Sequence, residues 1–182
     1  MDSTRGRLTL RNPVDDSIVV DDVVDAGKAD VDRAVASAKK AFRQGAWATY
    51  TGQQRAACLN RFADVVEKNI ECLAYAESLP SGRPVAGLIH FDLAHMVQVY
   101  RCKAPEPLQF FSKSGPNVCF ECSDYAGWAD KIHGQFFAED NGVAKIVRYE
   151  PLGVCASIAS WNSTFLYIGW KLAPALAAGN TV

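Results

Sequence analysis

The sequence predicts an α/β fold, and this prediction rests mainly on the second half of the chain. Residues 135–149 look like two strands joined by a turn at Glu139–Gly142, and the Asn-Gly pair in that turn is a strong β-hairpin signal. Residues 151–182 then follow the order strand, loop, helix and the first residues of another strand. This order is typical of a βα unit in a parallel sheet, whose second strand is here barely begun.

The first 45 residues predict a pair of strands followed by a helix. Residues 8–24 contain two short strands, and Asn12-Pro13 and Asp15-Asp16 supply turn residues between them. Residues 30–43 place apolar side chains at the spacing i, i+3, i+4 and i+7, which indicates an amphipathic helix. Gly45 is expected to end this helix.

Three further helices are predicted before residue 102. The first of them starts at Thr51, which stands in capping-box spacing with Gln54. The turn-rich stretch Pro80–Pro84 separates the second from the third. His90 and His95 lie on or beside the third helix, five residues apart, and are interpreted as structural. The predicted helices cover about 51–69, 71–79 and 88–101.

The C-terminal elements are predicted from small and apolar residues. Residues 152–159 indicate a strand, and residues 160–164 indicate a loop. Residues 165–178 form an almost wholly apolar helix, which Pro174 is expected to bend and Gly179 to end.

The composition is that of a globular protein without a strongly charged surface. Hydrophobic residues make up 49% of the chain, and 19 Lys+Arg against 20 Asp+Glu leave a net charge of -1. This balance supplies no electrostatic footprint, so we predict neither nucleic acid nor a membrane as a partner. The N-terminus has no apolar signal region, and the uncharged run 151–170 holds too many polar residues for a membrane span. We therefore expect a cytoplasmic protein with reduced cysteines.

Residues 102–124 follow neither a helical nor a strand period. This segment contains Cys102, Cys119 and Cys122, and together with His133 these side chains could complete a set of four zinc ligands. A second tight cysteine pair and the βαβ context of a redox motif are both missing from the sequence pattern. We therefore predict an incidental irregular insert with no metal site, and keep a metal or redox module as the alternative.

Several segments occur in an order that is specific to one family. Residues 125–182 contain YAGWADKIHG, RYEPLGVCASIASWN and GWKLAPALAAGNTV, and the earlier part contains NPVDDSIV and ESLPSGRP. Outside residues 102–124, nearly the whole chain closely resembles the N-terminal half of NAD(P)-dependent aldehyde dehydrogenases. The resemblance implies an incomplete aldehyde dehydrogenase-like fold. Its parts are N-terminal helices, part of a doubly wound parallel sheet and a β-hairpin oligomerisation arm.

The resemblance also divides the chain into five segments. They are residues 1–101, strands and helices of the cofactor-binding domain; 102–124, an unmatched irregular insert; 125–134, the end of a helix; 135–150, the oligomerisation hairpin; and 151–182, the truncated start of the dinucleotide-binding βα unit. Joining Arg101 to Tyr125 nearly restores the continuous helix that the family shows. Our hypothesis is therefore that the insert is a translated intron or a gene-model error.

The resemblance implies a cofactor-lining loop made of Ala159, Ser160, Trp161 and Asn162. Asn162 matches the asparagine of the family's Pro-Trp-Asn-Phe-Pro motif, whose side-chain amide stabilises the oxyanion of the thiohemiacetal. Ser160 replaces the usual proline and Ser163-Thr164 replace Phe-Pro, so this loop is less pre-set by its sequence. On its position alone, Asn162 could instead cap the helix that follows.

The reaction of the family is the NAD- or NADP-dependent oxidation of a small aldehyde to a carboxylic acid. A cysteine thiolate attacks the aldehyde, hydride passes to the nicotinamide, and a glutamate base assists hydrolysis of the thioester. None of the six cysteines aligns with that nucleophile, so we expect this chain to be catalytically incomplete alone and its own cofactor binding to be doubtful. The alternative is a non-catalytic regulatory or interaction subunit that pairs with a full-length homologue. As partners we expect a small aldehyde substrate in the parent family and other subunits of a homo- or hetero-oligomer, bound through residues 131–150.

Overall fold

The computed structural model of the chain describes residues 6–101 and 125–182. The predicted irregular insert and the alternative zinc site of residues 102–124 lie outside the described residues. The strands are β1 (Arg7–Arg11), β2 (Ile18–Val24), β3 (Gln135–Asp140) and β4 (Val143–Val147). The helices are α1 (Lys28–Gln44), α2 (Gly52–Lys68), α3 (Ile70–Ser81), α4 (Val85–Gly87), α5 (Ala94–Tyr100), α6 (Tyr125–Trp128), α7 (Thr164–Tyr167) and α8 (Ala173–Ala177).

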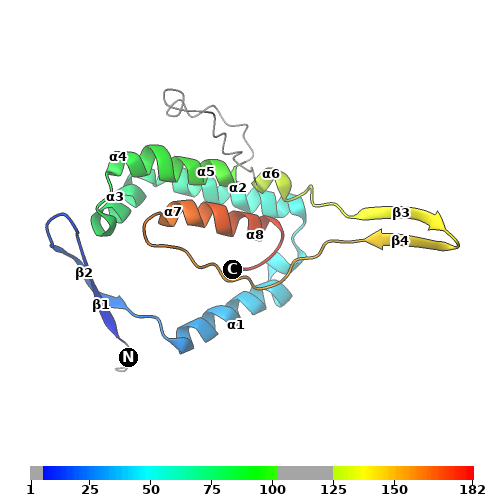
Figure 1. Ribbon diagram of the computed structural model, residues 1–182, viewed down its shortest axis with the longest axis horizontal. Helices are drawn as coiled ribbons and strands as arrows, with labels where there is room; N and C mark the ends of the chain where they lie inside the picture. The colour runs from blue at the N-terminus through cyan, green and yellow to red at the C-terminus, as the bar shows by residue number, and fades with distance from the viewer. Residues whose placement is uncertain (1–5, 102–124) are drawn as a thin grey trace.

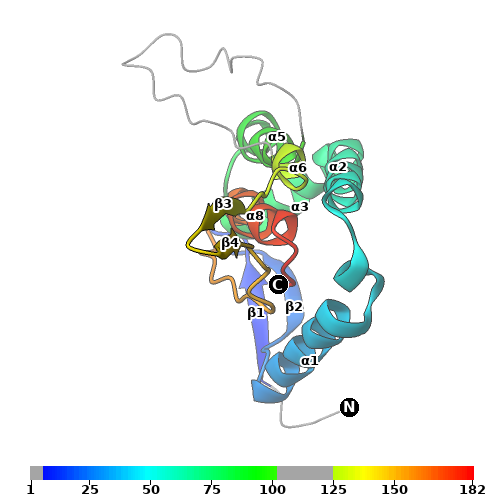
Figure 2. The same cartoon turned by 90° about the vertical axis from the view of Figure 1, so that its right-hand side faces the viewer.

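The helices form the centre of the molecule, and the two strand pairs lie at its margins (Figures 1 and 2). Helix α2 packs against α5 and α8, while the β3–β4 hairpin extends away from the helices and α1 lies on another side. The predicted α/β class is confirmed. No helix within the described ranges is long and apolar enough to cross a membrane.

Both predicted strand pairs form, and local turn residues explain each of them. β1 and β2 pair antiparallel across a turn in which the Asp16 amide donates to the Asn12 carbonyl and Asp16 adopts a φ of 58°. β3 and β4 also pair antiparallel, and their turn places Asn141 and Gly142 at φ values of 55° and 79°. Two successive positive φ angles are the requirement of a type I′ turn, which Asn-Gly meets at low cost.

The capping box predicted for the second helix is present. The Gln54 amide donates to Thr51 Oγ1 at 3.3 Å, and the Thr51 amide donates to Gln54 Oε1 at 2.8 Å. Helix α2 ends at Asn69, as its sequence indicates. Two of the free N–H groups at the start of α2 are thereby satisfied, which fixes where the helix begins.

The helical region around residues 70–100 is longer than the sequence predicts. Helix α3 continues through Pro80 and ends only where Gly82 adopts a left-handed φ of 68° and donates its amide to the Ser78 carbonyl. A π-helical segment, Leu88–Leu93, then joins α4 to α5. The prediction that Pro80 ends the helix is wrong: Pro80 lies in the last turn, where its missing N–H removes a single hydrogen bond and the helix still extends to Ser81.

The strand predicted over residues 152–159 is reduced to a single parallel bridge between Val154 and Thr181. In this bridge the Cys155 amide donates to the Thr181 carbonyl at 2.7 Å, and the Thr181 amide donates to the Gly153 carbonyl at 3.0 Å. The parallel direction agrees with the predicted βα unit. A longer strand does not form because the backbone groups of a parallel strand need a neighbour along their full length.

The apolar C-terminal helix forms, but it is interrupted before its proline. A π-helical segment, Ile168–Leu172, separates α7 from α8, and Pro174 lies in the first turn of α8. Proline lacks the N–H that would bond the preceding turn, so the disturbance expected at Pro174 appears as this wider segment. Gly179 then adopts a φ of 87° and ends the helix as predicted.

One apolar core joins the helices. Its largest fully buried side chains are Tyr100, Leu88 and Leu93, and they lie among small residues of the neighbouring helices. The cluster consists of Leu59, Ala63, Val66, Ala74, Leu88, Leu93, Met96, Val97, Val99, Tyr100, Ala126, Ala129, Ala173 and Ala177. Helices α2, α5 and α8 all contribute to this core, and Phe165 of α7 packs against it. The core therefore holds the helical segment that follows the predicted site loop.

Candidate functional site

The loop Ala159–Asn162 connects the Val154 bridge to helix α7 and lies on the surface. All four of its residues are exposed, and the Trp161 side chain is 82% exposed. An indole ring so open to water contributes little to the core of this chain. The four residues predicted from the resemblance are therefore together and accessible, and their binding role stays a prediction.

Asn162 is held by two contacts from different parts of the chain. The Ser160 hydroxyl donates to Asn162 Oδ1, and Arg83 Nη1 donates to the Asn162 carbonyl at 3.2 Å. The N-cap of α7 is Ser163, whose side chain makes no capping bond. The alternative interpretation of Asn162 as a helix cap is therefore wrong. The Asn162 amide nitrogen does not bond the first turn of α7.

The guanidinium of Arg83 is fixed by a buried carboxylate. Arg83 Nη2 donates to Asp92 Oδ1 at 2.7 Å and Arg83 Nη1 donates to Asp92 Oδ2, while the Asp92 side chain is only 1% exposed. The hydrogen bonds that Arg83 donates to the Asp92 carboxylate raise the pKa of Arg83 above its ordinary value, and burial opposes them. The sequence pattern does not indicate this pair. The only available signal was an arginine in the turn before the fourth predicted helix.

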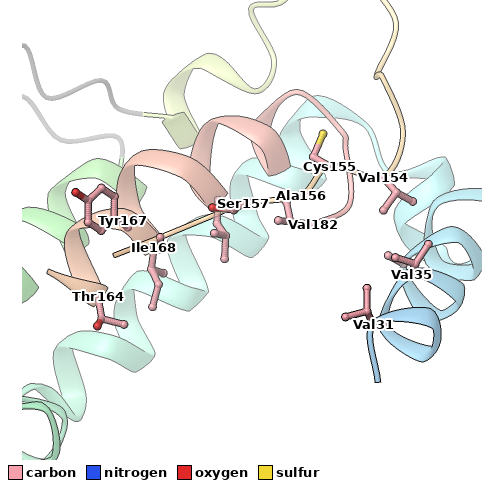
Figure 3. Close-up of a pocket in the computed structure, with 14 residues that line it drawn as sticks. Val31, Val35, Val154, Cys155, Ala156, Ser157, Thr164, Tyr167, Ile168 and Val182 are labelled. Carbon is pink, nitrogen blue, oxygen red and sulfur yellow. The ribbon is translucent and has the colours of Figure 1, made fainter. Parts of the chain in front are cut away.

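An apolar groove of about 370 Å³ begins at the site loop (Figure 3). Figure 3 shows Val31 and Val35 of α1 on one side, and Thr164, Tyr167 and Ile168 of the C-terminal helix on the other. The remaining lining residues are Ala34, Ala38, Val154, Cys155, Ala156, Ser157, Ala159, Leu172 and Val182. None of the residues that line the groove carries a charged side chain, so it suits an apolar or aromatic occupant better than a phosphate.

The other end of the loop is held by Lys171. Its Nζ donates to the Ile158 carbonyl and lies 5.3 Å from the centre of the Tyr167 ring. Lys171 is the one charged residue between positions 151 and 182. A lysine whose ammonium group lies over an aromatic ring and also bonds a loop carbonyl restricts that loop close to the groove.

His95 of α5 is buried in the core, and its ring nitrogen has a hydrogen-bond partner. Trp170 Nε1–H donates to His95 Nε2 at 2.8 Å, and the His95 residue is only 6% exposed. Burial lowers the pKa of His95 below its ordinary value, and the charge of Asp92 partly opposes this. The interpretation of His95 as structural agrees with this geometry, because a neutral ring is required to accept the indole N–H.

The chain is therefore expected to lose stability as the pH falls below about 6.5, the ordinary pKa of histidine. The pKa of His95 is lower in the folded chain than in the unfolded chain, so the unfolded chain binds more protons in this pH range. The free energy of unfolding therefore falls as the pH falls. Urea unfolding at a series of pH values measures the slope. His95→Phe should flatten it, whereas substitution of the exposed His90 by glutamine should not. An unchanged slope in His95→Phe would contradict the assignment.

A metal site has no support in the described part of the chain. No group of three His, Cys, Asp or Glu residues there is placed to hold a metal ion. The described cysteines, Cys58, Cys72 and Cys155, are all free thiols. Cys155 is half-buried and lines the groove.

Comparisons with known proteins give one consistent result. The sequence pattern of the aldehyde dehydrogenase family matches residues 1–182. Retinal dehydrogenase 2 of Homo sapiens is 37% identical over 162 residues, which are 88% of this chain and 27% of that protein. Aldehyde dehydrogenase, cytosolic 1 of Mus musculus is 36% identical over 177 residues, or 97% of this chain and 31% of that protein.

A solved structure agrees with these relatives. The NAD+ complex structure of aldehyde dehydrogenase from Bacillus cereus superposes with a TM-score of 0.80 at 30% identity, and the match covers 97% of this chain and 31% of that one. The chain thus spans less than a third of the length of the relatives named here.

Proposed function

Because the chain belongs to the aldehyde dehydrogenase family, we propose that it builds part of the cofactor-binding side of an enzyme that oxidises an aldehyde to a carboxylic acid with NAD or NADP. The observation that carries the proposal is the accessible loop Ala159–Asn162, whose first residue lines the apolar groove. In open α/β folds, ligands bind beyond the carboxyl ends of parallel strands, and this loop follows the Val154 bridge directly.

Asn162 is proposed as the oxyanion donor. Its Oδ1 accepts from Ser160, which leaves the two N–H groups of Nδ2 for an oxygen atom of a substrate. A preorganised amide donor near a developing negative charge lowers the barrier of acyl-type chemistry, and its loss costs on the order of 10²–10³ in rate. None of the cysteines described here lies in this loop, so the attacking thiolate is not assigned to residues 6–101 or 125–182.

The residues present fit one wall of a nicotinamide cofactor site. The exposed Trp161 indole and the neutral loop backbone suit contact with a flat ring, and the groove behind them is apolar. The groove lining offers no cationic side chain for the phosphates. When bound, the cofactor supplies the hydride acceptor. The described chain would contribute ring contacts from Trp161 and the groove, and a donor from Asn162.

This proposal predicts weak cofactor binding that is confined to the loop. In an NMR titration of the 182-residue chain with NAD, the amides of residues 159–162 should shift with a dissociation constant of ~1 mM or weaker. Trp161→Ala should reduce these shifts. The matched control is Trp128→Ala, because Trp128 is also exposed (57%) but lies on α6. Shifts that gather elsewhere, or NADH formation after addition of an aldehyde, would contradict the proposal.

The alternative function is a non-catalytic subunit, and the β3–β4 hairpin favours it. Phe136 and Ile146 on this hairpin are 69% and 77% exposed, and the hairpin extends away from the helices (Figure 1). Apolar side chains gathered on an exposed strand pair are typical of a surface that another subunit covers.

Co-purification with a full-length family member tests this surface. Capture should be strong for the unmodified chain and lost in a Phe136→Ser, Ile146→Ser double variant. Val65→Ser, on exposed apolar surface of α2 (58% exposed), serves as the control and should leave capture unchanged. Equal capture of all three forms would overturn the assignment of the hairpin.

A further inference from the structure

We propose that Arg83 and Ser160 are positioning residues that fix the direction of the Asn162 side chain. The proposal rests on the function suggested above for Asn162, and it concerns how this particular chain holds that residue. Its basis is a chain of contacts from the buried Asp92 through Arg83 to the Asn162 carbonyl, together with the Ser160 hydroxyl on Asn162 Oδ1.

The backbone of Asn162 is anchored to a rigid part of the fold. Asp92 lies in the π-helical segment at the centre of the helices, and its residue is 0% exposed. It holds Arg83 by two hydrogen bonds, and a bidentate carboxylate fixes the plane of a guanidinium as well as its position. The Arg83 N–H that reaches Asn162 is therefore preorganised, although the two residues are 79 positions apart.

The side chain of Asn162 is oriented by its neighbour. Because the Ser160 hydroxyl donates to Oδ1, the amide plane has a preferred rotation and Nδ2 faces away from Ser160. Nδ2 donates no hydrogen bond within residues 6–101 and 125–182, so both of its N–H groups are available to an external acceptor. One residue thus determines where the backbone sits and another determines which way the amide points.

These contacts hold a loop that lacks the proline of the family motif. Where the family motif has proline, this chain has Ser160, and a proline would restrict the backbone before Trp161. Serine does not restrict the backbone in that way, but it adds a hydroxyl that proline lacks. Lys171 holds the preceding carbonyl at Ile158, so the loop is tied at both ends by side chains.

The test is the order parameter of the Asn162 side-chain amide in the 15N-labelled chain. The Asn162 signal is identified by its loss in Asn162→Asp. In the unmodified chain the order parameter should stay above ~0.6, the limit for flexible groups, and it should fall below that value in Ser160→Ala and Arg83→Lys. Ser160→Thr keeps the hydroxyl and should restore the order. Lysine cannot reproduce the fork that joins Asp92 and the carbonyl.

Matched controls separate positioning from general loosening of the fold. Ser163→Ala removes a neighbouring hydroxyl that makes no capping bond, and Arg33→Lys alters an exposed ion pair on α1. Both should leave the Asn162 order parameter and the melting temperature unchanged. If Ser160→Ala has the same melting temperature as the unmodified chain and its Asn162 order parameter stays above ~0.6, the proposal is overturned. Absence of NAD-induced shifts would refute the proposed function. The order parameter of Asn162 is measured without NAD, so it would still test the positioning of Asn162.

Discussion

Asn180→Ala is expected to lower the free energy of unfolding by about 3 kcal/mol, because it leaves the buried Gly153 amide unpaired and removes one of the two hydrogen bonds that the Ala175 carbonyl accepts. Asn180 is 6% exposed, its Oδ1 accepts from the Gly153 amide at 3.0 Å, and its Nδ2 donates to the Ala175 carbonyl at 3.1 Å. Its own carbonyl also accepts from Trp47 Nε1 at 3.0 Å. One side chain therefore ties the end of α8 to the start of the parallel bridge.

Urea unfolding measures this effect, and Asn60→Ala is the matched control. Asn60 is half-buried, but within residues 6–101 and 125–182 its side-chain amide bonds only the Ala56 carbonyl in its own helix. Because alanine is the better helix former, the control should change the stability by less than about 0.5 kcal/mol. A loss in Asn180→Ala no larger than that of the control would contradict the assigned role.

Arg55→Met is expected to cost about 3 kcal/mol as well, since hydrogen bonds from a charged donor contribute ~1.5–3 kcal/mol each and this side chain is only half-buried. Arg55 donates to the carbonyls of Ala177, Tyr50 and Ala129 at 3.0, 2.9 and 3.1 Å. Burial lowers the pKa of Arg55, and within the described ranges it forms no ion pair with a carboxylate. Its stabilising role therefore comes from joining three separate segments.

Arg55→Lys distinguishes this geometry from simple charge. A lysine keeps the charge but cannot reach three carbonyls in one plane, so most of the loss should remain. Arg61→Met on the exposed face of the same helix is the control, and it should stay within about 0.5 kcal/mol of the unmodified chain. Full recovery of stability in Arg55→Lys would refute the explanation by three carbonyl contacts.

Elements whose signals are local could be predicted from the sequence. The Asn141-Gly142 turn, the Thr51 capping box and the Gly179 helix end are all confirmed. Each depends on the backbone preference of one or two residues and on hydrogen bonds to neighbours within a few positions. The strand over residues 152–159 could not be predicted in this way, because its formation depends on partner strands.

The site loop shows the same division. Several motifs in a fixed order already identified the family, and the sequence pattern placed a loop at residues 160–164 between a predicted strand and a helix. The contact of Arg83 with both Asp92 and Asn162 was visible only in the tertiary structure, as were the contacts by which Asn180 and Arg55 join segments more than 25 residues apart along the chain. The physical reason is that such contacts are made by polar groups that leave water together, and their pairing is set by packing of the helices rather than by any periodicity along the chain.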